Sequence, residues 1–585
     1  MAFPFLSIAF PFLSVCTFLV FSPFALAQLQ PDNTLGEENS VVTPNIIKGK
    51  DRIDRIDGGA QRGANLFHSF QEFNIQQGRG VYFSNPDGVQ NILTRVTGNN
   101  GSNILGTLGV DGKADLFFIN PNGIIFGPEA KLDVQGSFYG ATADSILFKN
   151  GFEFASSDPQ APPLLTVNVP IGLRLPEKPG SILVEGQGHN IGFDYESYDY
   201  TTYDQEINQN RGLEVGQGRT LGLVGGDMSL RGGKLTSEGG RVELGSVQSG
   251  VVGIMKDRTL SYDQNLKFGP IILYEASLID VSGNRGGEFQ IQGEEIKVQG
   301  SSIIRGQTLG DEDGGTSIIK ASEYIDVVGT KSFFDELQET GITYQDIPSG
   351  IILSTSGEGD AGDLTISARN IELRSSRLMM MNYGQGNAGN LTVSARNIII
   401  ADGSELFSDI DEIGEGNSGD VTITAQEILK MEDGYIQSVI WGKGNAGTIT
   451  ISAKNTELIG STLVVGVAPG ALGNGGNLKI YTENLLADSD SLISATTYGD
   501  GNAGNLTISA RNIKLGALIS ASSLGDAKGE AGTITINTET LSLDNQAEIR
   551  VKAESEAPKS AAGDLLINSN NIRLENEAKL TAETK

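Results

Sequence analysis

A ten-residue phrase recurs in the C-terminal half of the chain. It reads Gly-Asp-Leu-Thr-Ile-Ser-Ala-Arg-Asn-Ile at 362–371 and Gly-Asn-Leu-Thr-Val-Ser-Ala-Arg-Asn-Ile at 389–398. Eight copies, separated by intervals of 27 to 31 residues, start at Gly362, Gly389, Gly419, Gly447, Gly476, Gly504, Gly532 and Gly563. Self-similarity at such a period is typical of proteins built from stacked repeats.

Apolar and polar residues alternate after each of these glycines. The residues two and four positions on are aliphatic in every copy, as Leu364 and Ile366 are in the first, and Thr or Ser usually stands between them. Six positions on, the residue is small, as at Ala368. This period of two, with many β-branched residues, predicts a strand with one buried face.

Asparagine follows the strand in most copies. Because Asn readily adopts turn conformations, we expect a corner there. It occupies the eighth position after the glycine in six copies: Asn370, Asn397, Asn455, Asn484, Asn512 and Asn571. A large aliphatic residue returns three positions later in most copies and predicts a second short strand, whereas the rest of each unit reads as looser and ends in a Gly/Asn/Ser cluster.

One unit cannot bury its apolar face alone, but stacked units can, with strands pairing from coil to coil about 4.8 Å apart. We therefore predict an all-β fold, a right-handed parallel β-helix. A β-propeller needs longer units with four strands each, and a leucine-rich repeat needs a different Leu/Asn spacing. The stacked asparagines form either an internal ladder or a row of solvated turn residues.

The repeat continues upstream less regularly. Gly287 and Gly315 begin two further copies, but the copy at Gly315 carries an additional residue, so we expect Ile318, Ile325 and Val327 to fall out of register. The 47-residue interval from Gly315 to Gly362 leaves room for an insertion. Ser332–Leu337 within it has the pattern of a capped short helix, so we expect an inserted helix near 330–348 on the outside of a coil. Because the last copy is cut short at Lys585, we expect either a frayed end or a longer natural protein.

Composition narrows the class of protein. The chain has 585 residues and a net charge of −30, which excludes a phosphate-neutralising nucleic-acid binder and disfavours docking on anionic lipid. Glycine supplies 77 residues and proline only 18, so the glycine excess indicates tight turns rather than a collagen-like or disordered chain. A hydrophobic content of 38% is enough for a core.

The first 27 residues contain no charged side chain and end in Ala25-Leu26-Ala27. This pattern predicts a secretory signal peptide at 1–27, with an uncleaved membrane anchor as the alternative. The single cysteine, Cys16, lies inside it, so cleavage after Ala27 would leave 585 − 27 = 558 residues without a possible disulfide.

Residues 28–255 lack the period but are rich in short strands and aromatic residues. In the stretch Asp115–Phe126, Asn-Pro-Asn-Gly separates two apolar runs and predicts a turn between strands.

Asn120–Ile124 matches the NPNGI motif, and in its strand context the region from Asn39 to Ile146 resembles the two-partner secretion domain of filamentous-haemagglutinin-like exoproteins. An NPNL motif is missing from the sequence, and Asn85–Gly88 is the nearest equivalent. The resemblance divides the chain into a signal peptide (1–27), a secretion domain (28–255) and a β-helical repeat region (256–585).

The resemblance implies export through a dedicated outer-membrane barrel with periplasmic POTRA domains in a Gram-negative type of envelope. The chain would cross unfolded and fold outside, as a secreted or surface-bound rod of the adhesin or haemagglutinin type. Its further partner would be a host surface, a glycan or another copy of the chain. Asn120, Pro121, Asn122, Gly123 and Ile124 would form a structural and secretion determinant rather than a catalytic site.

Few residues offer chemistry. His68 and His189 are the two histidines, no second His or Cys completes a zinc set, and no cofactor is expected. Acidic residues cluster at Asp311–Asp313 and in the tyrosine-rich stretch Asp194–Asp204, where solvated loops are favoured over calcium sites and the tyrosines could contact a glycan or partner.

The alternative function is a β-helical polysaccharide lyase or hydrolase. Such an enzyme needs paired Asp or Glu with Lys or Arg on one coil face. Because the outward positions here are mostly Thr, Ser and Asn, we predict that the protein is not an enzyme.

Overall fold

The computed structural model describes residues 28–159, 166–194, 199–202, 212–329, 347–525, 527–554 and 561–584. The expected signal peptide, all of the expected helix except its last two residues, and most of the tyrosine-rich stretch lie outside these residues.

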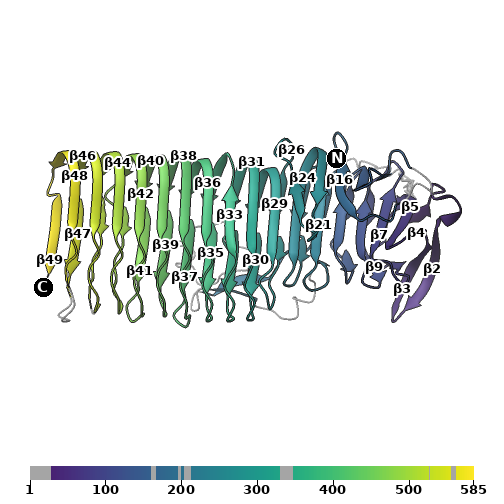
Figure 1. Ribbon diagram of the computed structural model, residues 1–585, viewed down its shortest axis with the longest axis horizontal. Helices are drawn as coiled ribbons and strands as arrows, with labels where there is room; N and C mark the ends of the chain where they lie inside the picture. Colours follow the sequence, from purple (N-terminus) through teal and green to yellow (C-terminus); the bar gives the residue numbers. More distant parts are fainter. Residues whose placement is uncertain are drawn as a thin grey trace, which may run out of the picture.

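The chain winds into a long rod of stacked coils, and the predicted parallel β-helix is confirmed (Figure 1). Each regular coil contributes strands to three faces, which we number in chain order. Faces 1 and 2 belong to one 29-stranded sheet, because many strands continue through the corner between them, and face 3 is made by a 13-stranded sheet extended by part of a 5-stranded one.

Parallel strands run the length of each face. Face 1 contains β5 (Asn65–Phe73), β7 (Asn91–Val96), β10 (Asp115–Ile119), β13 (Phe138–Ala141), β21 (Thr220–Gly225), β24 (Arg241–Ile254), β29 (Glu288–Gln299), β31 (Thr316–Val328), β33 (Asp363–Ser367), β36 (Leu391–Ala401), β38 (Val421–Glu432), β40 (Ile449–Ile459), β42 (Leu478–Ala487), β44 (Leu506–Leu515), β46 (Ile534–Leu543) and β48 (Leu565–Leu574). Face 2 contains β8 (Ser102–Ile104), β11 (Ile124–Phe126), β17 (Ile182–Glu185), β22 (Met228–Arg231), β27 (Ile271–Tyr274), β34 (Asn370–Arg374) and the second halves of the long strands. Face 3 contains β3 (Asp51–Gly58), β6 (Gly80–Ser84), β9 (Thr107–Asp111), β12 (Lys131–Asp133), β20 (Leu213–Glu214), β23 (Lys234–Thr236), β28 (Leu278–Asp280), β30 (Ile303–Thr308), β32 (Gly350–Thr355), β35 (Arg377–Asn382), β37 (Glu405–Ile410), β39 (Tyr435–Ile440), β41 (Thr462–Val467), β43 (Leu492–Ser494), β45 (Leu518–Ser520), β47 (Glu548–Ala553) and β49 (Lys579–Thr584).

The repeat phrase forms face 1 because its aliphatic residues stack coil on coil. Leu391 pairs with Val421, Val421 with Ile449, and Ile449 with Leu478, all fully buried. The Thr residues between them point outward and are half-buried, as the period of two requires. The inward side chains of all three faces make one continuous hydrophobic core.

Face 3 contains strands where we expected looser chain. In β35, Arg377–Asn382, all six residues are buried, so no alternation of apolar and polar residues marks the strand in the sequence. Its outer face is covered, because Met379 and Met381 pack with Phe407 and with Ile191, a residue that precedes this strand by almost 200 positions.

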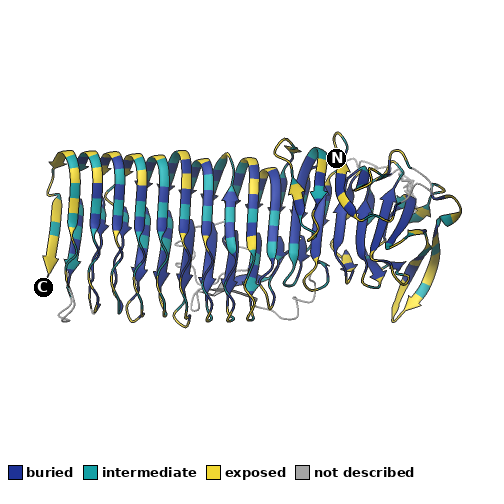
Figure 2. Cartoon of the chain, in the orientation of Figure 1, coloured by how far each residue is buried: buried dark blue, intermediate teal, exposed yellow. Residues whose placement is uncertain are grey.

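Extra elements surround the coils of the first half. β1 (Leu29–Pro31), η1 (Gly36–Glu38), β2 (Ser40–Lys48) and β4 (Ala60–Arg62) lie at the N-terminal end, and β14 (Ser145–Phe148), β15 (Glu153–Ala155), β16 (Pro170–Leu175), β25 (Leu260–Tyr262) and β26 (Lys267–Phe268) form antiparallel excursions over face 1. A hairpin of β18 (Ile191–Asp194) and β19 (Asp199–Thr202) leaves the coil between faces 2 and 3. These layers explain why most strands of the first half are buried, except the exposed hairpin of β2 and β3, whereas exposure alternates along the second half (Figure 2).

The repeat glycines lie where successive coils come into closest contact. A Cβ atom added to Gly447 would lie 2.1 Å from the carbonyl oxygen of Gly419, and one added to Gly419 would lie 2.2 Å from that of Gly389. Real Cβ atoms do not approach oxygen so closely, so each copy of this loop requires glycine. Much of the doubled glycine content is thus a packing requirement.

We expect Gly447→Ala to lower the free energy of unfolding by about 3 kcal/mol, the cost of forcing a methyl group into a filled contact. Gly470→Ala is the control: its Cβ would meet no atom within 4 Å, and only its φ of +83° opposes the change. That strain costs about 1 kcal/mol. Urea unfolding followed by the fluorescence of Trp441, the single tryptophan, measures both, and equal losses would contradict the packing explanation.

Candidate functional site

The NPNGI stretch forms the corner between faces 1 and 2 of one early coil, after β10 and before β11. The Asn120 side chain is fully buried, and its Nδ2 donates to the carbonyl oxygen of Asn100 at 3.0 Å and to Ser102 Oγ at 2.9 Å. Its Oδ1 accepts the backbone N–H of Asn122 at 3.0 Å, which closes a local turn. Asn120 therefore fixes both its own turn and the preceding coil.

The other residues of the motif join the corner to the coil on each side. Asn122 is exposed, yet its Nδ2 donates to the carbonyl oxygen of Gly98 at 2.9 Å in the preceding coil. Pro121 accepts the N–H of Gly180 at 2.8 Å, and Ile124, fully buried, donates to Ser181 at 3.0 Å. The motif thus ties three coils together.

Glycine is required twice at this corner. Gly123 has a φ of +124°, which side chains rarely adopt, and a Cβ on Gly180 would lie 2.3 Å from the backbone of Asn122. Consequently, residue 180, which precedes β17 and lies against the motif, must be glycine for β17 to stack on this coil.

Asn85–Gly88, the nearest match to the missing motif, forms the loop between faces 3 and 1. Asn85 Oδ1 accepts the N–H of Ala114 at 3.0 Å, and its Nδ2 donates to the carbonyl oxygen of Val89 at 3.1 Å. A second Asn-Pro turn is therefore also bound to the following coil, at a different edge of the rod.

A buried polar network holds the start of the described chain. Arg95 is fully buried, and its guanidinium donates to Ser69 Oγ at 3.0 Å, to Thr34 Oγ1 at 2.8 Å and to the carbonyl oxygen of Ala155 at 2.8 Å. Burial lowers the pKa of Arg95 to about 10. Although burial opposes it, hydrogen bonds that include those from Thr34, Thr97 and Ser69 lower the pKa of Asp32.

Both histidines are buried and neither is placed as a surface base. His68 Nδ1 lies 3.0 Å from Ser40 Oγ, and the ring centre lies 5.1 Å from that of Phe83. His189 Nδ1 accepts the N–H of Ile191 at 3.1 Å, and its Nε2 lies 2.7 Å from the carbonyl oxygen of Ser301. Burial lowers their pKa values to about 3 and about 4, so both rings are neutral at pH 7.

The predicted asparagine row lies at the same edge as NPNGI, between faces 1 and 2. Asn397 Nδ2 donates to Asn370 Oδ1 at 2.8 Å, Asn484 to Asn455 at 2.8 Å, and Asn512 to Asn484 at 2.9 Å. The side chains are half-buried or exposed, and Asn571 is exposed beside Thr540. They therefore form hydrogen-bonded steps on the outer surface of the rod.

A second asparagine ladder was missed in the sequence. Each member after the first donates its backbone N–H to the side-chain Oδ1 of the member one coil before, at 2.9 to 3.1 Å. Its members are Asn387, Asn417, Asn445, Asn474 and Asn502. Each of these asparagines stands two residues before a repeat glycine. The alignment on that glycine therefore already contains the evidence for this ladder, although the loop itself looks irregular in the sequence.

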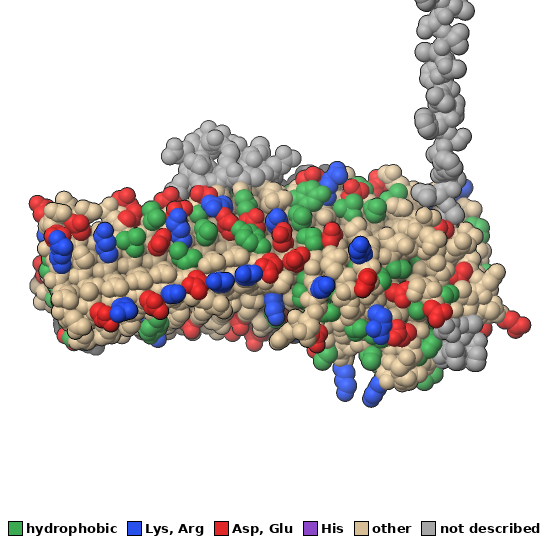
Figure 3. Space-filling view, turned by 90° about the horizontal axis from the view of Figure 1, so that it is seen from above, with side chains coloured by type: hydrophobic (Ala, Val, Ile, Leu, Met, Phe, Trp, Pro, Cys, Tyr) green, Lys and Arg blue, Asp and Glu red, His purple; other side chains and the backbone are tan. Residues whose placement is uncertain are grey.

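Charged side chains also pair from coil to coil, and acidic and basic groups alternate along one face of the rod (Figure 3). Arg369 lies 3.2 Å from Glu323, and Lys454 lies 3.3 Å from Glu427. Such exposed pairs each contribute about 0–1 kcal/mol, so they organise the surface more than they stabilise the fold.

Asp311–Asp313, the acidic cluster predicted as a loop, lies between faces 3 and 1, where Asp313 Oδ1 accepts the N–H of Asp360 at 3.0 Å. Within the described ranges, no group of three or more His, Cys, Asp or Glu side chains is arranged to hold a metal ion. The same residues include no helix with the length and apolarity needed to cross a membrane.

We expect Asn120→Asp to destabilise the corner by about 3 kcal/mol, because a buried carboxylate would face the carbonyl oxygen of Asn100 with no proton to donate. Asn122→Asp, at the exposed position of the same turn, is the control and should cost less than about 1 kcal/mol. Hydrogen exchange of the backbone amides of residues 115–126 reports the difference. Equal protection in the two variants would show that the buried amide does not hold the corner.

The buried histidines predict loss of stability in acid. Their folded pKa values lie below the unfolded value of 6.5, so the stability they allow is complete above pH 6.5 and is lost as the pH falls toward 3 to 4. Each contributes a slope of about 1.4 kcal/mol per pH unit. Glu243 and Asp409, whose pKa values burial raises to about 7, act in the opposite direction.

The difference between wild type and His68→Leu isolates the first histidine, because the other groups are common to both. As the pH falls from 6 to 4, the unfolding free energy of the wild type should fall relative to that of His68→Leu by about 1.4 kcal/mol per pH unit. A constant difference would mean that His68 does not titrate on unfolding.

The first half of the chain is similar to known secretion domains. A family model described as the TPS secretion domain matches residues 27–291. The heme/hemopexin-binding protein of Haemophilus influenzae is 39% identical over 69 residues, which is 12% of this chain and 7% of that protein, so this chain spans a small part of its curated relative.

Two solved structures are also similar. The HMW1 secretion domain from Haemophilus influenzae has 13% identity and a TM-score of 0.32, covering 94% of this chain and 100% of that one. A filamentous hemagglutinin secretion domain has 15% identity and a TM-score of 0.29, covering 63% and 97%. The match to the family model confirms the predicted resemblance to two-partner secretion domains over residues 27–291, which are just under half of the chain.

Proposed function

We propose that a dedicated outer-membrane transporter with POTRA domains and a barrel exports this chain, and that the repeat region then stands outside as a β-helical rod of adhesin type. A signal peptide at 1–27 would bring the chain to the periplasm, residues 28–255 would address it to the transporter, and 256–585 would form the displayed shaft. The product is secreted or held at the cell surface.

The observation that carries this proposal is the NPNGI corner. Asn120 and Asn122 bond to the preceding coil, whereas Pro121 and Ile124 bond to the following one. Since these contacts span three coils, the motif acquires its structure only when the early coils have formed. It is thus suited to lock the first coils together once a chain that arrives in an extended state begins to fold.

The repeat region fits export in the same way. Each coil there bonds to the coil before and the coil after, as β38 does to β36 and β40. Coils can therefore be added one at a time to a growing end. Cys16 is the only cysteine, so no disulfide would have to form or break within the exported part.

The displayed rod would act by adhesion, to a host surface, to a glycan or to another copy. The heme or hemopexin binding named for the relative does not indicate the ligand of this chain. The match covers 12% of the sequence, and His68 and His189 are both buried.

Secretion of Asn120→Ala tests the transport proposal. In cells that carry the partner transporter, we expect the amount in the medium or on the surface to fall at least about tenfold, since two donor bonds and the turn are lost together. Asn122→Ala should fall less, because one of its bonds is at the surface. Asn397→Ala, which also removes a corner amide but lies in the repeat region, is the matched control and should be secreted normally.

Deleting the transporter gene should abolish secretion of every form. Unchanged secretion without the partner would overturn the transport proposal, and an equal loss in Asn397→Ala would remove the special role of the NPNGI corner.

A further inference from the structure

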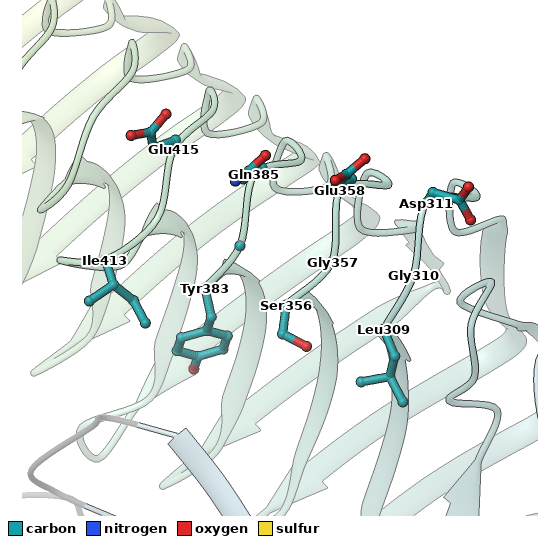
Figure 4. A pocket seen from close by; sticks show the side chains of 11 residues that line it. Leu309, Gly310, Asp311, Ser356, Gly357, Glu358, Tyr383, Gln385, Ile413 and Glu415 are labelled. Carbon is teal, nitrogen blue, oxygen red and sulfur yellow. The ribbon is translucent and has the colours of Figure 1, made fainter.

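A groove of about 640 Å³ runs along the edge between faces 3 and 1, across four successive coils. One side is a row formed by Leu309, Ser356, Tyr383 and Ile413, and the other is a parallel row formed by Asp311, Glu358, Gln385 and Glu415 (Figure 4). Each row takes one residue from each coil, so the groove repeats with the rise of the β-helix.

Aromatic side chains extend the first row beyond the groove. Tyr383, Trp441 and Tyr498 each follow the end of a face 3 strand, and the backbone N–H of each bonds to the preceding coil. Trp441 is 46% exposed and Tyr498 is 45% exposed, so both rings offer surface that a ligand could cover. We call Tyr383, Trp441 and Tyr498 the aromatic ridge.

The rings recur at every second coil, hence about 10 Å apart. In the intervening coils the chain makes a longer turn, closed by Gly414 N–H to Asp411 and by Ala471 N–H to Ala468. Rings and turns therefore alternate from Tyr383 to Tyr498, and Trp441 lies between the two turns.

Trp441 is held by a buried support. Its indole N–H donates to the carboxylate of Asp409, which also accepts the N–H of Val439 at 2.8 Å. Asp409 is buried, so its bond holds the ring in one orientation while nearly half of Trp441 stays exposed. A ring fixed in this way loses little conformational entropy when a ligand covers it.

We propose that the aromatic ridge and the groove bind an uncharged, extended polysaccharide laid along the rod axis. Sugar rings would stack on Tyr383, Trp441 and Tyr498, two coils matching the length of a disaccharide unit. Hydroxyl groups would bond to the row that includes Glu358, Gln385 and Glu415. The inference rests on the proposed surface display and gives its adhesive contact a ligand class.

The charges and the sheet edges favour this ligand over other polymers. Three carboxylates line the groove, so a polyanion such as nucleic acid or an acidic glycan would be repelled. A peptide bound by strand addition needs a free backbone edge, but every described face 3 strand from β30 to β47 has a neighbour on both sides. A repeating, uncharged polymer with stacking faces and many hydroxyls meets both conditions.

The single tryptophan makes the test direct. The purified full chain is titrated with cellohexaose, chitohexaose and xylohexaose as neutral probes, with hexagalacturonate as the anionic probe and a lysine hexapeptide as the cationic one. We expect at least one neutral probe to bind and to change the fluorescence of Trp441, and the charged probes to leave it unchanged.

Variants locate the site, with affinity electrophoresis as a readout that needs no tryptophan. Trp441→Ala and Tyr498→Ala should each weaken binding about tenfold, the size of one aromatic contact. Tyr481→Ala is the matched control, since Tyr481 is 43% exposed but lies on face 1, away from the ridge, and its affinity should be unchanged. Circular dichroism confirms that each variant retains its β structure.

Failure of all neutral probes at millimolar concentration would overturn the proposal. So would preferred binding of either charged probe, or equal weakening in Tyr481→Ala. Because purified chain is used, these results are independent of the transporter, and loss of transporter-dependent secretion leaves them unaffected.

Discussion

The rest of this structure depends on parallel backbone hydrogen bonding between successive coils. Once β36 is paired with β38 in one register, Leu391 must lie on Val421 and the loop glycine Gly389 must lie on Gly419. A shift of one residue would turn every aliphatic side chain outward and leave the core empty. The inward residues, the corner amides and the loop glycines therefore depend on one register, and each helps to define it.

A strand of this fold can be predicted from the sequence where its outward side chains face water. The outer surfaces of faces 1 and 2 in the repeats are solvated, so Leu364 and Ile366 alternate with Thr and Ser. The sequence therefore predicts these strands and the corner between them. At Gly315 the register is also kept: Ser317 and Ile319 pair with Leu364 and Ile366, and the additional residue is accommodated at the corner. Polar Ser317 occupies an inward position there, which hid the match.

Face 3 shows why the remaining strands could not be predicted from the sequence. Where another segment covers a strand, as Ile191 helps to cover the strand that contains Met379, both faces are buried and the period of two disappears. That cover comes from far away in the sequence, and no local pattern encodes it. The NPNGI turn was visible because Asn, Pro and Gly each have strong turn preferences, but its bonds to Asn100 and Gly180 are long-range and appear only in the fold.

Stacking also places equivalent side chains of successive coils in rows. The residue types in a row therefore indicate what that part of the surface does. Rows with alternating charge, such as Arg511 beside Glu539 at 3.1 Å, avoid repulsion between groups about 4.8 Å apart. The groove row departs from that rule, with Asp311 and Glu358 on adjacent coils and no cation until Lys443, 3.4 Å from Glu415. Local rules of stability are most often broken where a surface serves a ligand. An acidic row beside exposed, oriented rings is therefore better explained by recognition than by folding.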